Sequence, residues 1–278
     1  MCIFIISLGI TLYPIISTVY NDHHQSEIHT QHQQIIEDTD KTELCKIKES
    51  AMTYNRSIQP GSQVVESFSI DAINSAAIDY GQQLNLNGDS IMGYINIPKI
   101  NVNLPIYHGT DDATLELGIG HLLGSSLPVG GPNTHAILTA HSGMASQKMF
   151  SDLPQLAIGD IFYLDILDER LAYMVDQIKT VLPHDTSFLG IEYEQDLCTL
   201  VTCTPFGVNT HRLLVRGHRI PSEEAEVIVQ ENTPEVSPPS TWEQEYFKGV
   251  LIGLAMVGAA GIIIIIFHFH RRGRYESR

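Results

Sequence analysis

The stretch TLVTCTPFGVNTHRLLVRGHRI, residues 199–220, holds two β-rich runs joined by a short loop. The first run ends on Cys203, and the second begins at Arg212 after a loop that contains proline, glycine and asparagine. If the runs pair as antiparallel strands, the end of one faces the start of the next, which makes Cys203 and Arg212 cross-strand neighbours. Arg216 lies roughly 13 Å further along at ~3.3 Å per residue. The spacing therefore predicts that Arg212, and not Arg216, lies beside the Cys203 thiol.

Alternating apolar and polar residues mark several other segments as strands. Residues 94–109 alternate with prolines among them, which is typical of strands at a sheet edge or bulge. Residues 135–143, HAILTAHSG, form a further candidate strand, and residues 161–182 predict a hairpin that turns near residues 168–169. Closely spaced strands with short loops predict an all-β domain over residues 91–220, either a barrel or a sandwich.

The region before this domain, residues 21–90, has the pattern of helices. Residues 22–57 are polar with scattered Ile and Leu and predict helix, which Pro60 and Gly61 interrupt. Residues 71–86 place apolar side chains at i, i+3 and i+4 spacing, which predicts an amphipathic helix.

Both ends of the chain are apolar. Residues 1–20 carry no charge, and residues 249–267 are 19 uncharged residues, about the number that spans the ~30 Å core of a bilayer. The basic tail, residues 268–278, places the C-terminus in the cytoplasm by the positive-inside rule. The first segment lacks the basic start and cleavage site of a signal peptide, so we expect an uncleaved membrane helix with a basic leader upstream.

Two membrane crossings would leave both termini in the cytoplasm and the intervening chain outside the cell. Residues 221–248 are acidic and contain several prolines. Such a composition buries too little apolar surface to fold by itself, so we expect an unfolded tether between the domain and the membrane.

The composition excludes several kinds of partner and site. The formal net charge is -16, which argues against nucleic-acid binding because phosphates require a basic face. The four cysteines, Cys2, Cys45, Cys198 and Cys203, are too few and too irregularly spaced to predict a disulfide framework. No CxxC or HExxH motif occurs, so we expect no metal site.

An exported domain with an unpaired cysteine raises the question of whether that thiol is reactive. The thiolate is the nucleophilic form, and a guanidinium such as that of Arg212 favours it and can stabilise an oxyanion. Acyl transfer also needs an acid and base that titrates near neutral pH. Of thirteen histidines, His141 stands at a strand end before a glycine-containing loop, a typical place for a site residue. Buried cysteines are common in strands, however, so the residues alone leave open whether Cys203 is a nucleophile or part of the core.

The order of these motifs resembles one family, the sortases, which are cysteine transpeptidases of Gram-positive cell surfaces. TLVTC, followed nine positions after its cysteine by an arginine, is similar to the sortase signature. The segments MGYINIPKINVNLPIYHGT, GIGHLLGSSLPVGG and NTHAILTAHSG resemble class C, the sortases that build pili, as do the hairpin and the two apolar ends. The likeness covers about residues 50–220.

This resemblance implies a closed eight-stranded β-barrel in which Cys203 is the nucleophile, His141 the general acid and base, and Arg212 the oxyanion stabiliser. The thiol would cleave the Thr–Gly bond of an LPxTG-like sorting signal, and the lysine amine of a neighbouring pilin would resolve the thioacyl intermediate. The resemblance further implies the plasma membrane of a Gram-positive bacterium, an extracellular catalytic domain, and neither a metal nor an organic cofactor. The alternatives are a sortase that anchors surface proteins to a peptidoglycan precursor, and a membrane-tethered adhesin or scaffold without catalysis.

One departure from the class C pattern concerns its lid, which usually carries an Asp-Pro-aromatic motif over the active site. The corresponding place, within residues 58–70, has Glu66-Ser67-Phe68. The missing proline removes a fixed φ and a restraint on the residue before it. We therefore predict a looser lid in which Phe68 lies over the thiol and Glu66 approaches the guanidinium. An ordinary loop is the alternative.

Overall fold

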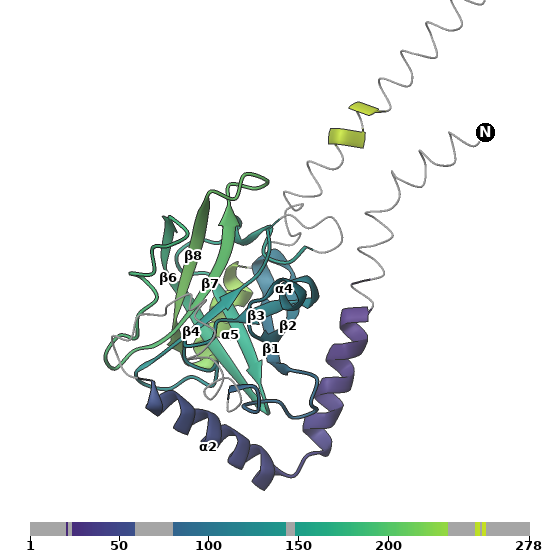
Figure 1. Ribbon diagram of the computed structural model, residues 1–278, viewed down its shortest axis with the longest axis vertical. Coiled ribbons are helices and arrows are strands. Elements are labelled where there is room, and N and C mark those ends of the chain that lie inside the picture. The colour runs from purple at the N-terminus through teal and green to yellow at the C-terminus, as the bar shows by residue number, and fades with distance from the viewer. Residues whose placement is uncertain are drawn as a thin grey trace, which may run out of the picture. The chain divides into compact units, whose positions relative to one another are not determined.

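A computed structural model of the chain describes residues 21, 24–58, 80–142, 148–232, 248–250 and 252–253 (Figure 1). A first helix covers residues 24–38. The further elements in chain order are α2 (Lys41–Ser57), β1 (Ile91–Ile97), η1 (Pro98–Ile100), β2 (Val102–His108), α4 (Asp112–Leu117), β3 (Ile119–His121), β4 (Thr134–Thr139), η2 (Leu153–Gln155), β5 (Ile161–Ile166), β6 (Glu169–Val181), β7 (Asp196–Thr204), β8 (His211–Ile220) and α5 (Ser222–Asn232).

The strands close into one barrel in the order β1-β2-β3-β4-β7-β8-β6-β5, with β5 pairing back to β1. Two neighbouring pairs, β2 with β3 and β4 with β7, are parallel, and the others are antiparallel. The predicted all-β barrel of eight strands is confirmed. The predicted hairpin consists of β5 and β6, and the stretch over residues 199–220 lies in the antiparallel pair of β7 and β8.

Successive residues of the strands point alternately into the barrel and out of it. In β7, Cys198 and Leu200 belong to the main core, whereas Val201 packs in a separate apolar cluster. In β8, Leu213 faces the core and Leu214 joins the separate cluster. The barrel thus has a second apolar surface on the outer face of these strands.

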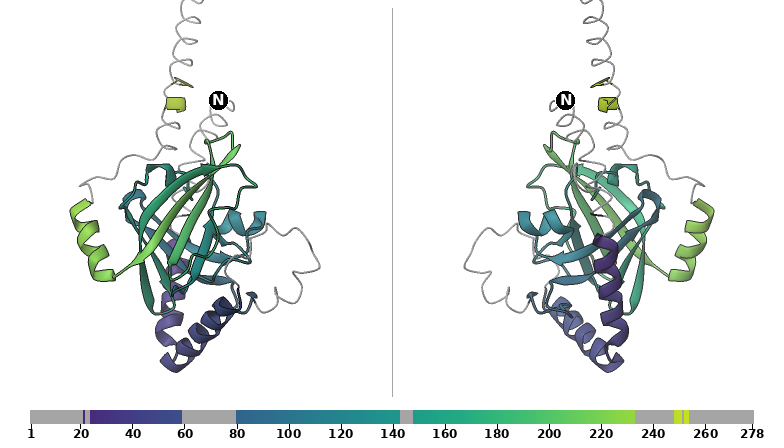
Figure 2. Two further views of the ribbon diagram at one scale, coloured as in Figure 1. Left: turned by 90° about the vertical axis from the view of Figure 1, so that its left-hand side faces the viewer. Right: turned by 90° about the vertical axis from the view of Figure 1, so that its right-hand side faces the viewer.

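The N-terminal region is helical, as predicted, but it consists of two helices. α2 begins after Asp40, whose carboxylate accepts a hydrogen bond from the Thr42 amide at 2.7 Å. α2 packs against one end of the barrel (Figure 2), where the Asn55 side chain exchanges two hydrogen bonds with the backbone of Leu127. These helices are therefore part of the folded unit.

Most of the helix predicted over residues 71–86 lies outside the described residues. In its described part, Tyr80 is helical and buried, and the chain turns over residues 81–84 instead of continuing as helix. Leu84 has a left-handed φ of 56°, which an α-helix does not allow. The helix therefore ends earlier than predicted, although its described apolar side chains, Tyr80 and Leu84, are buried as the spacing suggests.

The acidic segment after the barrel is partly helical, which contradicts the prediction of an unfolded tether. Residues 222–232, expected in an unfolded tether, form α5. Ala225, Ile228 and Val229 recur at i, i+3 and i+4 and pack against apolar residues of the barrel strands. Glu223, Glu224 and Glu226 are exposed, so a high charge did not prevent a packed helix. Residues 233–247 of the predicted tether lie outside the described residues.

The two segments predicted to cross a membrane, residues 1–20 and 249–267, lie outside the described residues except for 249–250 and 252–253. Within the described ranges, no helix combines the length and apolar character that a bilayer crossing requires. The membrane crossings therefore stay predictions.

We predict that Ala225→Asp lowers the free energy of unfolding by about 2 kcal/mol, because it places an unpaired carboxylate in the apolar contact between α5 and the barrel. Val227→Asp is the matched control, since Val227 is 55% exposed on the same helix. Thermal unfolding followed by circular dichroism compares the two variants. Equal losses in both would contradict the packing of α5 on the barrel.

Candidate active site

A cavity of about 280 Å³ lies on the outer face of the barrel, beside the ends of β4 and β7 and the start of β8. Its lining includes His141, Cys203 and Arg212, which the sequence analysis singled out from separate segments. The structure thus brings all three predicted site residues to one cavity. This volume lies just below the ~300 Å³ at which ligand pockets begin.

The floor of the cavity is apolar. It consists of buried side chains from four neighbouring strands, namely Ile137, Val181, Val201 and Leu214. Leu189, from the loop that joins β6 to β7, packs onto them. An apolar floor excludes water and strengthens the interactions of any charge held above it.

Cys203 and Arg212 are paired residues of β7 and β8, as the sequence predicts. Cys203 is a free and half-buried thiol. Arg216 pairs with Thr199 further along the same ladder, and its guanidinium binds the carboxylate of Asp176 at 2.9 and 3.0 Å. Arg216 therefore has a structural partner of its own, and Arg212 is the arginine beside the thiol.

The guanidinium of Arg212 makes few contacts. Its Nη1 donates to the carbonyl oxygens of Asn209 and His211 at 3.4 and 3.3 Å, which are long hydrogen bonds. Within the described part of the chain, no carboxylate forms an ion pair with it. Its remaining N–H groups are therefore available to an anion or to a developing oxyanion beside the thiol.

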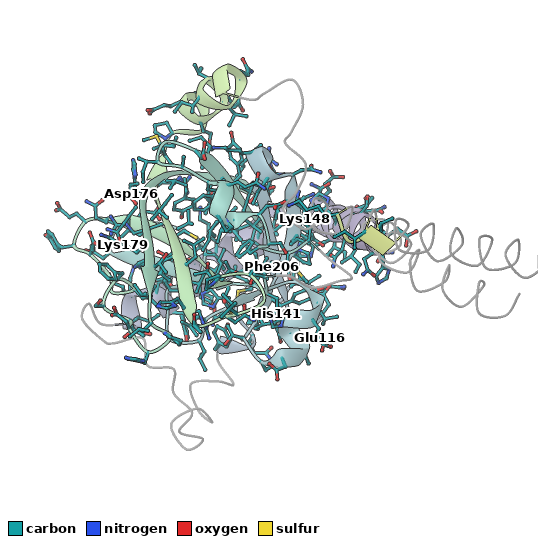
Figure 3. All side chains as sticks on the ribbon, turned by 90° about the horizontal axis from the view of Figure 1, so that it is seen from above. Glu116, His141, Lys148, Asp176, Lys179 and Phe206 are labelled. Carbon is teal, nitrogen blue, oxygen red and sulfur yellow. The ribbon has the colours of Figure 1, made fainter. Side chains whose placement is uncertain are left out.

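The parallel ladder between β4 and β7 brings His141 to the same edge of the sheet as Cys203. Thr139 is the partner of Val201 in this ladder, and His141 and Cys203 each follow two residues later. Parallel strands end at a common edge, so the two side chains emerge next to each other. Figure 3 marks His141, together with Phe206 on the loop that follows Cys203.

Two hydroxyl groups that the sequence analysis did not single out join these two strand ends. The hydroxyl of Thr202 donates to the carbonyl oxygen of Ala140, and the hydroxyl of Ser142 donates to that of Cys203, both at 2.8 Å. Ser142 follows His141 in the sequence, and Thr202 precedes Cys203. This proximity is the signal in the sequence by which the two hydroxyl residues could have been assigned to the site. The hydrogen bonds hold the histidine loop against β7.

Cys198 has a structural role. Its side chain lies in the barrel core, where burial raises the pKa of the thiol well above its usual range. Cys198 and Cys203 are five residues apart on one strand, so they occupy opposite faces. Cys45 is exposed on α2.

Histidines elsewhere in the barrel serve as hydrogen-bonding groups of the fold. His121 is fully buried, and burial lowers its pKa to about 4. Its Nδ1 lies 2.9 Å from the Tyr80 hydroxyl, and its Nε2 lies 2.8 Å from the Ser126 carbonyl oxygen. Across the described ranges, no group of three or more His, Cys, Asp and Glu side chains is arranged to hold a metal ion.

Comparison with known proteins gives one consistent family. The sequence profile of the Sortase domain matches residues 95–220. Sortase A of Streptococcus agalactiae is 30% identical over 184 residues, a match that covers 65% of this chain and 67% of that protein. Sortase D of Bacillus subtilis is 33% identical over 131 residues, 46% of this chain and 63% of that protein, so the match spans less than two thirds of this relative.

Solved structures are similar over a larger share of the chain. Sortase C1 from Streptococcus agalactiae has a TM-score of 0.66 and 45% identity, covering 70% of this chain and 99% of that one. Sortase C from Streptococcus pneumoniae has a TM-score of 0.62 and 40% identity, with 70% and 97% covered. Clostridium perfringens sortase C, solved with the C-terminal cell wall sorting motif, has a TM-score of 0.58 and 40% identity, with 70% and 99% covered.

We predict that an alkylating reagent modifies Cys45 and Cys203 in the native protein and Cys198 only after unfolding. A buried thiol with a raised pKa presents neither the access nor the thiolate that alkylation requires. Peptide mapping by mass spectrometry assigns each modified cysteine. Modification of Cys198 as fast as Cys203 in the native protein would contradict the placement of the two thiols on opposite faces of β7.

Proposed function

Because this chain belongs to the sortase family, we propose that it is an extracytoplasmic cysteine transpeptidase that cleaves an LPxTG-like sorting signal and joins it to a lysine amine of a pilin. The observation that carries the proposal is the convergence of His141, Cys203 and Arg212 on one cavity. The similarity of the chain to class C structures supports the assignment to pilus assembly. The Streptococcus pneumoniae structure is described in terms of pilin substrate specificity, and the Clostridium perfringens structure holds a sorting motif.

In the first step, the Cys203 thiol gives its proton to His141, and the sulfur attacks the carbonyl carbon of the threonine in the sorting signal. The carbonyl oxygen gains negative charge, which the guanidinium of Arg212 stabilises. The carbon–nitrogen bond to glycine then breaks, and His141 gives a proton to the leaving amine. The product is a thioacyl enzyme.

In the second step, a lysine ε-amine gives a proton to His141 and attacks the thioester. The carbon–sulfur bond breaks, the Cys203 thiolate leaves, and an isopeptide bond forms. Splitting one amide exchange into two acyl transfers is what a covalent nucleophile achieves. The scheme requires no metal and no organic cofactor.

The proposal extends to location and to the lid. The predicted membrane segments, residues 1–20 and 249–267, would hold the barrel outside a Gram-positive plasma membrane with both termini in the cytoplasm. Glu66 and Phe68 lie outside the described residues, so their role as a loose lid over Cys203 stays part of the proposal.

We predict that Cys203→Ala lowers cleavage of a fluorogenic LPxTG peptide by several powers of ten, because the whole covalent route depends on the thiol.

Arg212→Lys keeps a positive charge but loses the planar guanidinium, and we expect kcat for the same peptide to fall about a hundredfold. Arg170→Lys is the matched control, since Arg170 pairs with Asp165 on other strands. Mass spectrometry detects the thioacyl adduct in the parent chain; parent-level turnover in the Cys203 or Arg212 variant would refute the assignment.

The choice of acceptor separates the proposed function from its alternatives. We predict that the chain, given a sorting-signal protein and a lysine-bearing pilin, forms a ladder of covalent oligomers on a denaturing gel. A product only with a peptidoglycan-precursor amine would instead favour a sortase that anchors surface proteins. Absence of any thioacyl adduct would favour the non-enzymatic adhesin or scaffold.

A further inference from the structure

The loop that joins β6 to β7, residues 182–195, forms one wall of the cavity; we refer to it as the β6–β7 loop. Its cavity-lining residues are Pro183, Asp185, Thr186 and Leu189. The two chemical steps assign no role to this wall. What holds the loop in place therefore decides the shape of the space in which a peptide would bind.

His135 lies beneath this loop on β4, two residues before Ile137 of the cavity floor. It is 1% exposed. Its Nδ1 lies 2.7 Å from the carbonyl oxygen of Gly190, and its Nε2 lies 2.7 Å from the hydroxyl of Thr199 on β7. Gly190 directly follows Leu189, so the imidazole holds the loop at the point where its leucine packs onto the floor.

The two partners determine the tautomer of His135. A carbonyl oxygen only accepts hydrogen bonds, so Nδ1 carries the proton and donates to Gly190. Nε2 then presents a lone pair, to which the Thr199 hydroxyl donates. Burial lowers the pKa of His135 below its ordinary value, and the Arg216 guanidinium also lowers it, whereas the Gly190 carbonyl, Glu192 and Asp176 raise it. The net lowering of the pKa favours the neutral ring. The Thr199 hydroxyl thus favours the tautomer that binds the loop.

Other contacts hold the loop beyond Gly190. Glu192 accepts a hydrogen bond from Arg216 at 2.6 Å, but its carboxylate is 55% exposed, and exposed ion pairs contribute little. The Glu194 amide donates to the Asn133 side chain at 2.9 Å. Both contacts involve residues further along the chain from the cavity-lining Leu189 than Gly190 is. The buried imidazole is therefore well placed to control the position of the wall.

From this geometry we infer that His135 and Thr199 form a positioning pair that holds the β6–β7 loop as a fixed wall for the peptide bound at Cys203. The identity of the peptide rests on the proposed function, whereas the hold on the loop rests on the hydrogen bonds alone. Neither residue of the pair lines the cavity. Loss of the pair is therefore expected to weaken peptide binding and to leave the chemical step nearly unchanged.

Thr199→Val and Thr199→Ser test the inference in the full chain, because valine keeps the shape but lacks the hydroxyl that serine retains. We expect Thr199→Val to raise KM for a fluorogenic LPxTG peptide about tenfold with kcat changed less than about twofold, since a displaced wall costs binding. Amide hydrogen exchange over residues 186–192 is expected to become faster in the same variant. Thr199→Ser is expected to behave as the parent, and so is Thr53→Val, the same change on α2.

His135→Asn and His135→Phe give a second pair of variants. The asparagine amide nitrogen stands near the place of Nδ1 and can still donate to Gly190, whereas phenylalanine cannot, so we expect the larger rise in KM for phenylalanine. The inference would be overturned if Thr199→Val and His135→Phe left both KM and the amide exchange of the loop unchanged. It would also be overturned if these variants lowered Tm but left KM unchanged. If the parent chain cleaves no sorting peptide, the proposed function fails, and the exchange measurement still decides whether the pair holds the loop.

Discussion

β7 lies between a parallel neighbour and an antiparallel neighbour, and the site depends on this arrangement. Pairing with β8 sets Cys203 opposite Arg212, and pairing with β4 brings His141 to the same edge. Both ladders extend along the strand, so a slip of one residue would turn every outward side chain into the barrel. The hydrogen bonds and core of the barrel thus enforce the placement of the three groups.

The alternation of side chains gives the two faces of β7 different chemistry. Cys198 faces inward, where burial disfavours the thiolate and the side chain acts as a small apolar residue. Cys203 faces outward at the strand end, beside a cation and above an apolar floor. The same residue type on one strand is therefore inert at one position and available for chemistry at the other. Which cysteine is available follows from the direction in which it points.

Local patterns in the sequence predict the two hairpins well, because a short loop and period-two alternation determine both the pairing and the register. The parallel pairing of β4 with β7 has no such signal, since more than fifty residues separate the strands. His141 was therefore reached through its strand-end position and the family resemblance. The sequence does not clearly predict α5, because the acidic composition of the segment indicates an unfolded tether more strongly than the three apolar residues at helical spacing indicate a helix. The hydroxyls of Ser142 and Thr202, and the pair of His135 and Thr199, bond across elements that only the tertiary fold brings together.

The position of the cavity on the outer face of the barrel leaves the Arg212 guanidinium accessible to water, and none of the described carboxylates pairs with it. A half-exposed guanidinium is hydrated in the free protein, so its lack of an ion pair among the described residues carries a small cost. A peptide that fills the cavity displaces this water, and the interaction between the cation and a negative charge becomes stronger in the lower dielectric. Arg212 above an apolar floor is thus suited to stabilise charge that appears only during the reaction.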